Sequence, residues 1–283
     1  MSGGVEMQRA ASLARLTAFG RGSDGEIDLA EAALLLASLD HPDPPLDACR
    51  EHLALMAAEL AETPAGKGDQ SLLARVRALH EVLAERHGFR GDDRNYDDLE
   101  NANLISVIER RRGLPVALAI LYLDAARRLG WPAEGLNFPG HFMIRLAAAD
   151  GRGVVDPFAG GELRDALELR QLLKRGAGPE AELRPEHLAA VGNRDILLRL
   201  ENNIKMRLLQ AGEVEGALAI LERMLLIAPS EPLLWFEAGG HYAHLGKLRA
   251  AMEALERCSG LAIGDSLGQQ AEIRLRELRS KLN

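Results

Sequence analysis

The chain has 283 residues, 47% of them hydrophobic, which is enough to bury one large core or two ordinary ones. Its formal net charge of −8 at pH 7 argues against a general nucleic-acid-binding protein, because neutralising phosphates requires clustered lysine and arginine. No stretch approaches the roughly 18 consecutive apolar residues of a membrane-spanning helix, and the first residues lack the apolar centre of a secretion signal. We therefore expect a cytoplasmic protein that binds neither nucleic acid nor membranes.

The composition predicts a mainly helical chain, since aromatic residues make up only 4% and Ala, Leu, Arg and Glu are abundant. We expect residues 1–24 to form a flexible N-terminus. Residues 25–90 contain three runs with helical apolar spacing, separated by breaks at residues 41–45 and 63–66. This part should form a small helical subdomain.

Residues 91–188 contain the clearest strand patterns of the chain. They open with helices predicted from Asn103 to Arg112 and from Pro115 to Leu129. Proline suits the first helical position, because its missing N–H would have no partner there in any case. The pattern then alternates over residues 141–146, which predicts a strand with one buried face.

Asp150-Gly151 predicts a turn after this strand, with residues 153–158 as the returning strand. A tight turn places Asp156 opposite Arg145, whereas a looser one places it opposite Met143 or His141. In both cases Asp156 and His141 lie on one face of the hairpin. A hydrogen bond between them is allowed, and through it the carboxylate would orient the imidazole and fix its tautomer.

Neither cysteine of the chain lies near this pair. Cys49 and Cys258 fit no metal-binding or redox spacing, and we expect both to be packing residues. The histidines are scattered; His241 and His244 form the only helical i, i+3 pair, and no third ligand stands nearby. The sequence therefore predicts no metal site and no cofactor.

Residues 189–283 contain an internal repeat with a period of 34 residues, which is the tetratricopeptide length. The second copy carries Trp235, Gly239 and Tyr242, which resembles the W-x₂-L-G-x₂-Y pattern with Ala238 in place of Leu. The matching positions are Gly212 with Gly246, Ala217 with Ala251, Leu221 with Leu255, and Met224 with Cys258. In the first copy Glu201 and Lys205 stand at the positions of Trp and Gly.

A last helix over residues 269–282 would cap the repeats with a polar outer face. Residues 191–283 carry 12 basic and 12 acidic side chains, so this part is no electrostatic clamp for acidic polymers. Helical repeats usually bind a peptide or another protein in a groove, here with Trp235, His241 and Tyr242 as candidate groove residues. The alternative is that the two repeats simply pack on the preceding domain.

The run from Arg127 to Ala133, RRLGWPA, resembles the R-x-x-G-[IL]-P-A element of the transglutaminase-like core. More widely, ERRRGLPVALAILYLDAARRLG, PGHFMIRL and VDPFAGG, followed by the repeats, resemble the bacterial SirB family. The likeness begins at about residue 25 and is strongest over residues 95–165. It implies a predominantly helical α+β protein: a papain/transglutaminase-like core with a small antiparallel sheet, then C-terminal tetratricopeptide repeats.

In the enzymes that this core resembles, a cysteine opens a buried helix, and the following strands supply a histidine and an aspartate. The resemblance places His141 and Asp156 at the catalytic positions and Pro115 at the position of the cysteine. Since proline cannot attack a carbonyl group, the resemblance implies a pseudoenzyme that acts as a protein-interaction or regulatory module.

Two alternatives stay open. An amide or acyl hydrolase or transferase would use His141 and Asp156 with an unrecognised nucleophile, for which Ser106, Tyr96, Tyr122 and Cys49 are the candidates. A metal site on His141, Asp156 and a further carboxylate is the third hypothesis. His141 can equally be a partly buried histidine that Asp156 or a backbone carbonyl satisfies.

The polar cluster of residues 95–101 and the basic run Arg110–Arg112 lie close to this core in the sequence. Asp and Asn before a helix commonly cap its free N–H groups, and the arginines fit a solvated face with Glu100 and Glu109 nearby. A binding role is the alternative, with Tyr96, Asn103 and Arg112 as candidate cleft residues.

Overall fold

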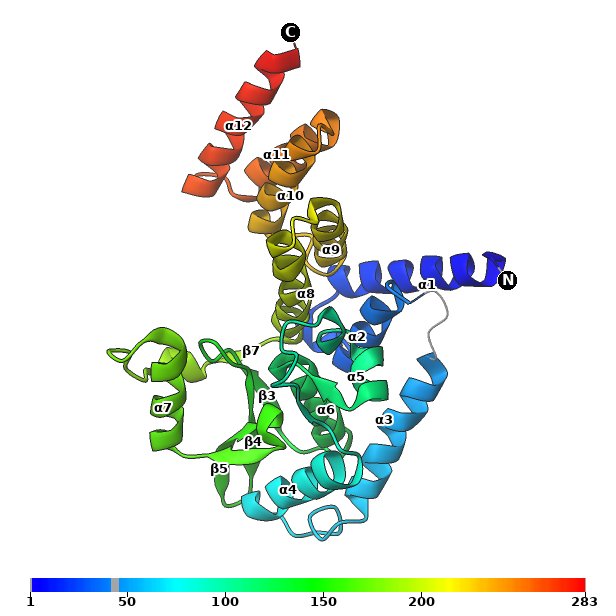
Figure 1. Cartoon of the computed structure of the whole chain (residues 1–283), viewed down its shortest axis with the longest axis vertical. Helices are drawn as coiled ribbons and strands as arrows, with labels where there is room; N and C mark the ends of the chain where they lie inside the picture. Colours follow the sequence, from blue (N-terminus) through cyan, green and yellow to red (C-terminus); the bar gives the residue numbers. More distant parts are fainter. Residues whose placement is uncertain (1, 42–45, 283) are drawn as a thin grey trace. The chain divides into compact units, whose positions relative to one another are not determined.

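The computed structural model describes residues 2–41 and 46–282, so most of the predicted break at residues 41–45 lies outside the described residues. The chain divides into two compact units. One unit comprises the residues up to Ser12 and Asp24–Leu200, and the other comprises Leu13–Ser23 and the residues from Glu201 onward. Figure 1 shows the chain as a ribbon.

The N-terminal part is helical, as the apolar spacing predicts, but it includes one helix that the pattern does not indicate. Its elements are α1 (Ser2–Arg21), η1 (Asp24–Glu26), α2 (Leu29–Ser38), α3 (Leu46–Ala61), α4 (Leu72–Leu79) and the π-helical segment η2 (His80–Arg86). The sequence predicts a flexible segment where α1 lies. Helix α1 has almost no amphipathic character, and what buries it is tertiary: Leu16 is fully buried, and the hydroxyl of Ser12 lies 3.2 Å from that of Ser38.

The central helix of the first unit is α6 (Pro115–Arg128), preceded by α5 (Leu104–Arg110). Every residue of α6 from Pro115 to Leu123 is buried, and the helix contacts α2, α3, α4 and two strands of the sheet. The start of α6 follows the prediction, with Pro115 at the first helical position. The apolar stretch from Pro115 to Leu123 therefore lies at the centre of the core.

The sheet is antiparallel and has five strands in the order β6-β5-β4-β3-β7. The strands are β3 (Ala133–Leu136), β4 (Met143–Ala148), β5 (Gly151–Asp156), β6 (Glu162–Arg164) and β7 (Ala190–Val191). Figure 1 shows it between α6 and α7 (Ala166–Ala177). The predicted single buried face of β4 is wrong, because Met143 and Ile144 are both fully buried. Met143 packs with Phe138 and two leucines of α7, so the second face is covered too.

The turn between β4 and β5 lies one residue earlier than Asp150-Gly151 indicates, which shifts the pairing of the two strands by two residues. Ala148 pairs with Gly151, and Ile144 pairs with Val155, so the turn residues are Ala149 and Asp150. The cause is tertiary, since the N–H of Ala149 donates to the carbonyl of Gln70 and the carboxylate of Asp150 accepts from the N–H of Leu72. The turn is still a tight two-residue turn, and extending the ladder by one pair places Asp156 opposite Met143, the partner that the looser alternative predicted.

A second, parallel ladder joins two short strands, β1 (Arg90–Gly91) and β2 (Arg112–Gly113). Three short 3₁₀ segments complete the first unit: η3 (Leu99–Asn101), η4 (Pro157–Ala159) and η5 (Pro185–Leu188).

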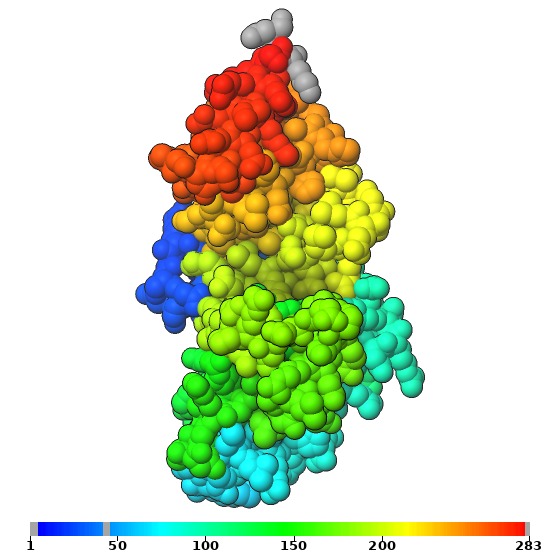
Figure 2. All heavy atoms as spheres, turned by 90° about the vertical axis from the view of Figure 1, so that its left-hand side faces the viewer, coloured from blue at the N-terminus to red at the C-terminus, as the bar shows by residue number. Residues whose placement is uncertain are grey.

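The repeat region consists of consecutive helices: α8 (Asn193–Gln210), α9 (Val214–Ile227), α10 (Pro232–His244), α11 (Leu248–Leu261) and α12 (Ser266–Leu282). Helices α9 and α11 begin 34 residues apart (248 − 214), which is the period in the sequence. Gly239 permits the close packing of α10 on α11, since a Cβ atom there would lie 2.7 Å from Leu255. Figure 2 shows α11 and α12 side by side in orange and red.

The first repeat departs from the motif for a reason visible in its packing. Glu201 and Lys205 are almost fully buried, and the ammonium group of Lys205 is paired with the carboxylate of Glu237 on α10. A buried ion pair between α8 and α10 thus stands where apolar packing would hold a typical repeat together.

Candidate functional site

The site begins with a histidine and an aspartate brought together by the β4–β5 hairpin. Nε2 of His141, just before β4, lies 2.8 Å from Oδ1 of Asp156 at the end of β5. Both side chains are largely buried, with exposed fractions of 12% and 4%. The hydrogen bond that the strand parity allows is present. No hydrogen bond to Nδ1 of His141 is found within the described residues.

Asp156 is held by more groups than His141 alone. Oδ1 also accepts from the backbone N–H groups of Phe158 and Ala159 at 3.1 and 3.4 Å, and so caps η4. Oδ2 accepts from Nε and Nη2 of Arg164, both at 3.2 Å. Burial raises the pKa of Asp156, but the hydrogen bond to His141 and the charges of His141 and Arg164 outweigh it and lower the pKa overall. The carboxylate is therefore an ionised centre that organises the loop after β5.

The ring of Phe158 covers this pair. Its centroid lies 5.8 Å from that of His141 and 6.0 Å from that of Tyr96, in edge-to-face geometry in both cases. The tip of the ring points at Gly91, where a Cβ atom would meet three ring atoms at 2.5 Å. Tyr96, a predicted cleft residue, is thus brought to the same aromatic cluster as His141.

Pro115 lies at the start of α6 and is buried. The residue before it, Leu114, donates its N–H to the carbonyl of Asn101 at 2.8 Å, and Gly113 pairs with Gly91 of β1. The helix start is therefore linked through the parallel ladder to Gly91, against which Phe158 packs.

The two thiols of the chain belong to other places in the fold. Cys49 lies on α3 and Cys258 on α11, and both are buried. Burial, helped by the charge of Glu109, raises the pKa of Cys49 to about 11. Burial also raises the pKa of Cys258. A raised pKa keeps a thiol protonated and unreactive, as expected for packing residues.

The hydroxyl groups considered as replacement nucleophiles are also engaged or buried. Ser106 contacts the carboxylate of Glu100 and lies 3.2 Å from Nε2 of His41. Tyr122 is fully buried against Gly161, and its hydroxyl has no hydrogen-bond partner within the described residues. Burial and the charge of Asp156 raise its pKa, so this phenol resists ionisation.

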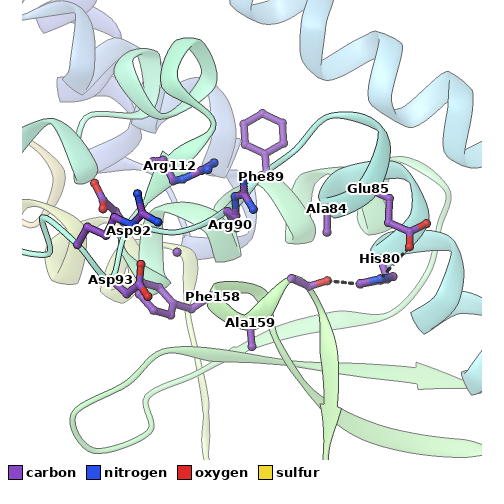
Figure 3. Close-up of a pocket in the computed structure, with 13 residues that line it drawn as sticks. His80, Ala84, Glu85, Phe89, Arg90, Asp92, Asp93, Arg112, Phe158 and Ala159 are labelled. Carbon is purple, nitrogen blue, oxygen red and sulfur yellow. Dashed lines mark hydrogen bonds and ion pairs between the residues drawn. The ribbon is translucent and has the colours of Figure 1, made fainter.

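A cleft of about 880 Å³ adjoins Phe158. Its charged lining residues are Glu85, Arg90, Asp92, Asp93, Arg94 and Arg112. Figure 3 shows Arg90, Arg112 and the two aspartates at one end, and His80 with Glu85 at the other. We call it the arginine cleft. Nδ1 of His80 lies 2.7 Å from the carbonyl oxygen of Gly160, which fixes the second end.

The structure separates the three predicted cleft residues. Arg112 lines the arginine cleft, and Tyr96 lies behind its Phe158 wall. Asn103 lies outside the lining: its side chain caps α5 and donates to the carbonyl of Ala37 at 3.1 Å. The capping interpretation of the polar cluster fits Asn103 and also Asp98, which caps η3.

The basic run Arg110–Arg112 does not form one solvated face. Arg110 pairs with Asp98 at 2.8 Å and with Asp92 at 3.7 Å. The guanidinium of Arg111 lies 2.7 Å from Nε2 of His52 and over the ring of Phe89. The three side chains point to three different environments because the chain turns at Arg111, whose φ is +59°.

In the repeats, the three candidate groove residues differ in their contacts. The indole N–H of Trp235 donates to the carbonyl of Pro229, and the hydroxyl of Tyr242 donates to Glu222 at 2.7 Å. Both rings pack on the apolar cluster around Leu255 and Cys258. His241 is half-buried, and burial lowers its pKa. Trp235 and Tyr242 thus have packing partners, and His241 is the most available of the three.

No group of three or more His, Cys, Asp or Glu side chains suited to a metal ion is found in residues 2–41 and 46–282. Over the same ranges no helix is both long and apolar enough to span a membrane.

Sequence reasoning missed Phe158, Arg164 and Arg90. The Asp-Pro-Phe-Ala run gave a usable signal for Phe158, because an aspartate before proline commonly caps a short helical turn. Arg164 and Arg90 carried no such signal, since their partners are set by strand pairing.

This fold and this site define a protein with a transglutaminase-like core joined to tetratricopeptide-type helices. The family model described as "Transglutaminase-like superfamily" matches residues 47–202, and the model described as "Tetratricopeptide repeat" matches residues 204–277. The chain is 31% identical over 243 residues to a UPF0162 protein of Xylella fastidiosa, covering 83% of this chain and 84% of that protein. It is also 31% identical over 178 residues to Protein SirB1 of Salmonella typhimurium, covering 62% and 66%.

The chain therefore belongs to the transglutaminase-like superfamily and, within it, to the family of the UPF0162 and SirB1 proteins. The predicted fold class and the resemblance to the SirB family are both confirmed. Among solved structures, one of menin, titled as revealing the binding site for Mixed Lineage Leukemia (MLL) protein, covers 90% of this chain and 70% of its own. Its TM-score is 0.42 at 11% identity, which supports no argument about function.

Proposed function

We propose that this protein is a non-catalytic transglutaminase-like protein that acts as a protein-interaction or regulatory module. The observation that carries the proposal is Pro115, a buried proline at the start of the central helix, where we align the family's nucleophilic cysteine. The raised pKa values of Cys49 and Cys258 support it, because neither thiol forms a thiolate readily near neutral pH. The other contacts of Asp156 support it as well, since this carboxylate accepts hydrogen bonds from Arg164 and from the backbone of η4 in addition to contacting His141.

The repeats supply the surface that such a module needs. Helical repeats present extended surfaces to peptides and proteins, and the matched region spans residues 204–277. The polar groups of α10 offer side-chain recognition, with His241 near the charges of Glu237 and Lys205.

The catalytic half of the proposal is tested by a broad screen for amide hydrolysis and amine transfer with the full chain. We expect no turnover above the level of His141→Ala. Turnover that His141→Ala abolishes, in a variant with an unchanged circular dichroism spectrum, would establish the alternative: a hydrolase or transferase with an unrecognised nucleophile. The specific observation that favours this alternative is Nδ1 of His141, which has no hydrogen bond within the described residues.

The interaction half is tested by cross-linking pull-downs from the source organism with the full chain. We expect a defined protein to be captured by the parent chain and lost with His241→Ala. The matched control is Arg249→Gln on α11, whose side chain is 92% exposed and pairs only with Glu253 within the described residues. Equal capture by the parent chain and both variants would contradict a binding surface at His241 in the repeats.

A further inference from the structure

Two arginines lie side by side in the arginine cleft, and neither forms an ion pair within 4.0 Å in the described residues. Arg90 and Arg112 are direct neighbours in the parallel β1–β2 ladder. Like charges on neighbouring strands repel each other. Burial lowers the pKa of Arg112, and the charge of Arg90 lowers it further. The charge of Arg94 acts in the same direction, and those of Asp92 and Asp93 act in the opposite one. Three arginines therefore face two carboxylates at this end of the cleft, and one positive charge is in excess.

The contrast with a neighbouring arginine shows that acidic partners are within reach. Arg110 pairs with Asp98 and Asp92. Within the described residues, Arg90, Arg94 and Arg112 form no ion pair within 4.0 Å, although Asp92 and Asp93 line the same cleft.

The guanidinium of Arg112 is held in one orientation by its own backbone surroundings. Nη1 donates to the carbonyl of Arg111 at 2.8 Å and to that of Gly88 at 3.3 Å. Its Nε and Nη2 atoms have no hydrogen-bond partner within the described residues. This free edge is the one that receives the two oxygens of a carboxylate in a bidentate pair.

The turn before Arg112 is strained, and the strain positions the pair. Arg111 is the one non-glycine residue with a positive φ within the described residues, and such a backbone is unfavourable for an L side chain. The turn brings β2 beside β1, where the N–H of Arg90 donates to the carbonyl of Arg111. The stacking of Arg111 on Phe89 and its contact with His52 hold the turn in place.

The rest of the lining selects the kind of ligand. The excess at the arginine end is one positive charge, and Glu85 lies at the other end with His80. The cleft therefore suits one negative charge and disfavours polyphosphates or nucleic acids. The ring of Phe158 offers an apolar wall for a carbon body.

We propose that the arginine cleft binds an organic carboxylate, with its two oxygens on Arg112, its charge shared by Arg90, and its carbon body against the ring of Phe158. The carboxylate belongs either to a small acid or to the C-terminus of a peptide. The proposal concerns the first unit alone and does not depend on the function proposed for the repeats.

The test is a nuclear magnetic resonance titration of the ¹⁵N-labelled full chain, read at the arginine Nε–H signals. The probes are 3-phenylpropionate with its neutral amide, the peptide Gly-Gly-Phe with a free C-terminus and as its amide, and inorganic phosphate. At about 10 mM, a suitable range for ligands of this size, we expect both acids to shift the Arg112 signal and both amides to leave it in place.

Three variants complete the experiment. We expect Arg112→Lys to weaken the binding of acids about tenfold or more, because an ammonium group cannot form the bidentate pair. Arg90→Gln removes an exposed side chain with no hydrogen bond within the described residues, so it should keep the fold and weaken binding to a smaller degree. The matched control is Arg152→Gln, an exposed arginine of β5 outside the cleft lining, which should bind as the parent does.

Each outcome of the titration either supports the carboxylate site or contradicts it. Tighter binding of the peptide acid than of 3-phenylpropionate supports a peptide terminus, and equal or weaker binding supports a small acid. Acids that bind no better than their amides, or that bind Arg90→Gln and Arg112→Lys as well as the parent, would overturn the proposal. Phosphate binding more tightly than either carboxylate would overturn it too.

Discussion

Oδ1 of Asp156 lies 2.8 Å from Nε2 of His141 and at the same time accepts from two backbone N–H groups, while Oδ2 holds Arg164. In a catalytic triad the aspartate serves chiefly to orient its histidine. Here the same carboxylate also caps η4, and η4 carries Phe158 against Gly91. The His–Asp pair is therefore part of what shapes the wall of the arginine cleft.

Asp156→Asn should destabilise the protein by about 2–3 kcal/mol, because it leaves the partly buried Arg164 and the capped N–H groups with a weaker acceptor. Urea unfolding measures the change. The matched control is Glu162→Gln, which removes an exposed carboxylate that pairs with the same Arg164 at 3.0 Å and should change stability by less than about 0.5 kcal/mol. If both substitutions changed the free energy of unfolding equally, Asp156 would contribute no more to stability than the exposed Glu162.

Gly91→Ala should destabilise by about 1–3 kcal/mol, since the added Cβ atom would meet the Phe158 ring at 2.5 Å. In a Phe158→Ala background the same substitution should cost much less, because the obstructing ring is gone. A double-mutant cycle by thermal or urea unfolding measures this coupling. Additive effects would mean that the ring does not rest on Gly91.

The stability of the protein should fall between pH 6.5 and about 4 partly because of His52. Burial, with the charges of Arg111 and His87, lowers the pKa of His52 from 6.5 to about 4. In that range the unfolded chain binds a proton that the folded chain does not. The free energy of unfolding therefore rises with pH, and acidification lowers it.

Replacing His52 with Gln should flatten this part of the pH profile, as measured by urea unfolding at a series of pH values. Gln at the exposed His244 is the control and should leave the slope unchanged. An unaltered slope in the His52 variant would assign the acid loss to other groups.

Pro115→Cys, made in a Cys49→Ala, Cys258→Ala background, should give a thiol with a pKa below the usual value of about 8.5. The helix N-terminus and the imidazole of His141 would both favour the thiolate, against the burial of this position. The ultraviolet absorbance of the thiolate as a function of pH measures the pKa. Adding His141→Ala should raise it; a thiol with an ordinary or raised pKa would contradict the alignment of Pro115 with the nucleophile.

The sequence predicted what local pattern and period control. The proline at the first helical position set the start of α6, and the 34-residue period set the spacing of α9 and α11. Strand parity placed His141 and Asp156 on one face of the hairpin, because side chains alternate along any strand. Parity survives a register shift of two residues, which is why the pair was found although the turn lies elsewhere.

Tertiary contacts decided the rest. The hairpin register depends on Gln70 and Leu72, which are far from the turn in sequence, and the burial of Met143 depends on α7. Helix α1 has no apolar stripe, so the sequence pattern does not predict it.

The pairing of Arg90 with Arg112 shows most clearly which features follow from the sequence and which depend on tertiary contacts. The sequence by itself determined the start of the central helix, the repeats, the transglutaminase-like core and the lack of a cysteine at its helix start. It named Arg112 as a candidate cleft residue but not Arg90 beside it, because a strained turn at Arg111 and a two-residue ladder bring together side chains that are 22 positions apart (112 − 90). Only the folded chain fixes such contacts, since no local propensity favours two like charges side by side.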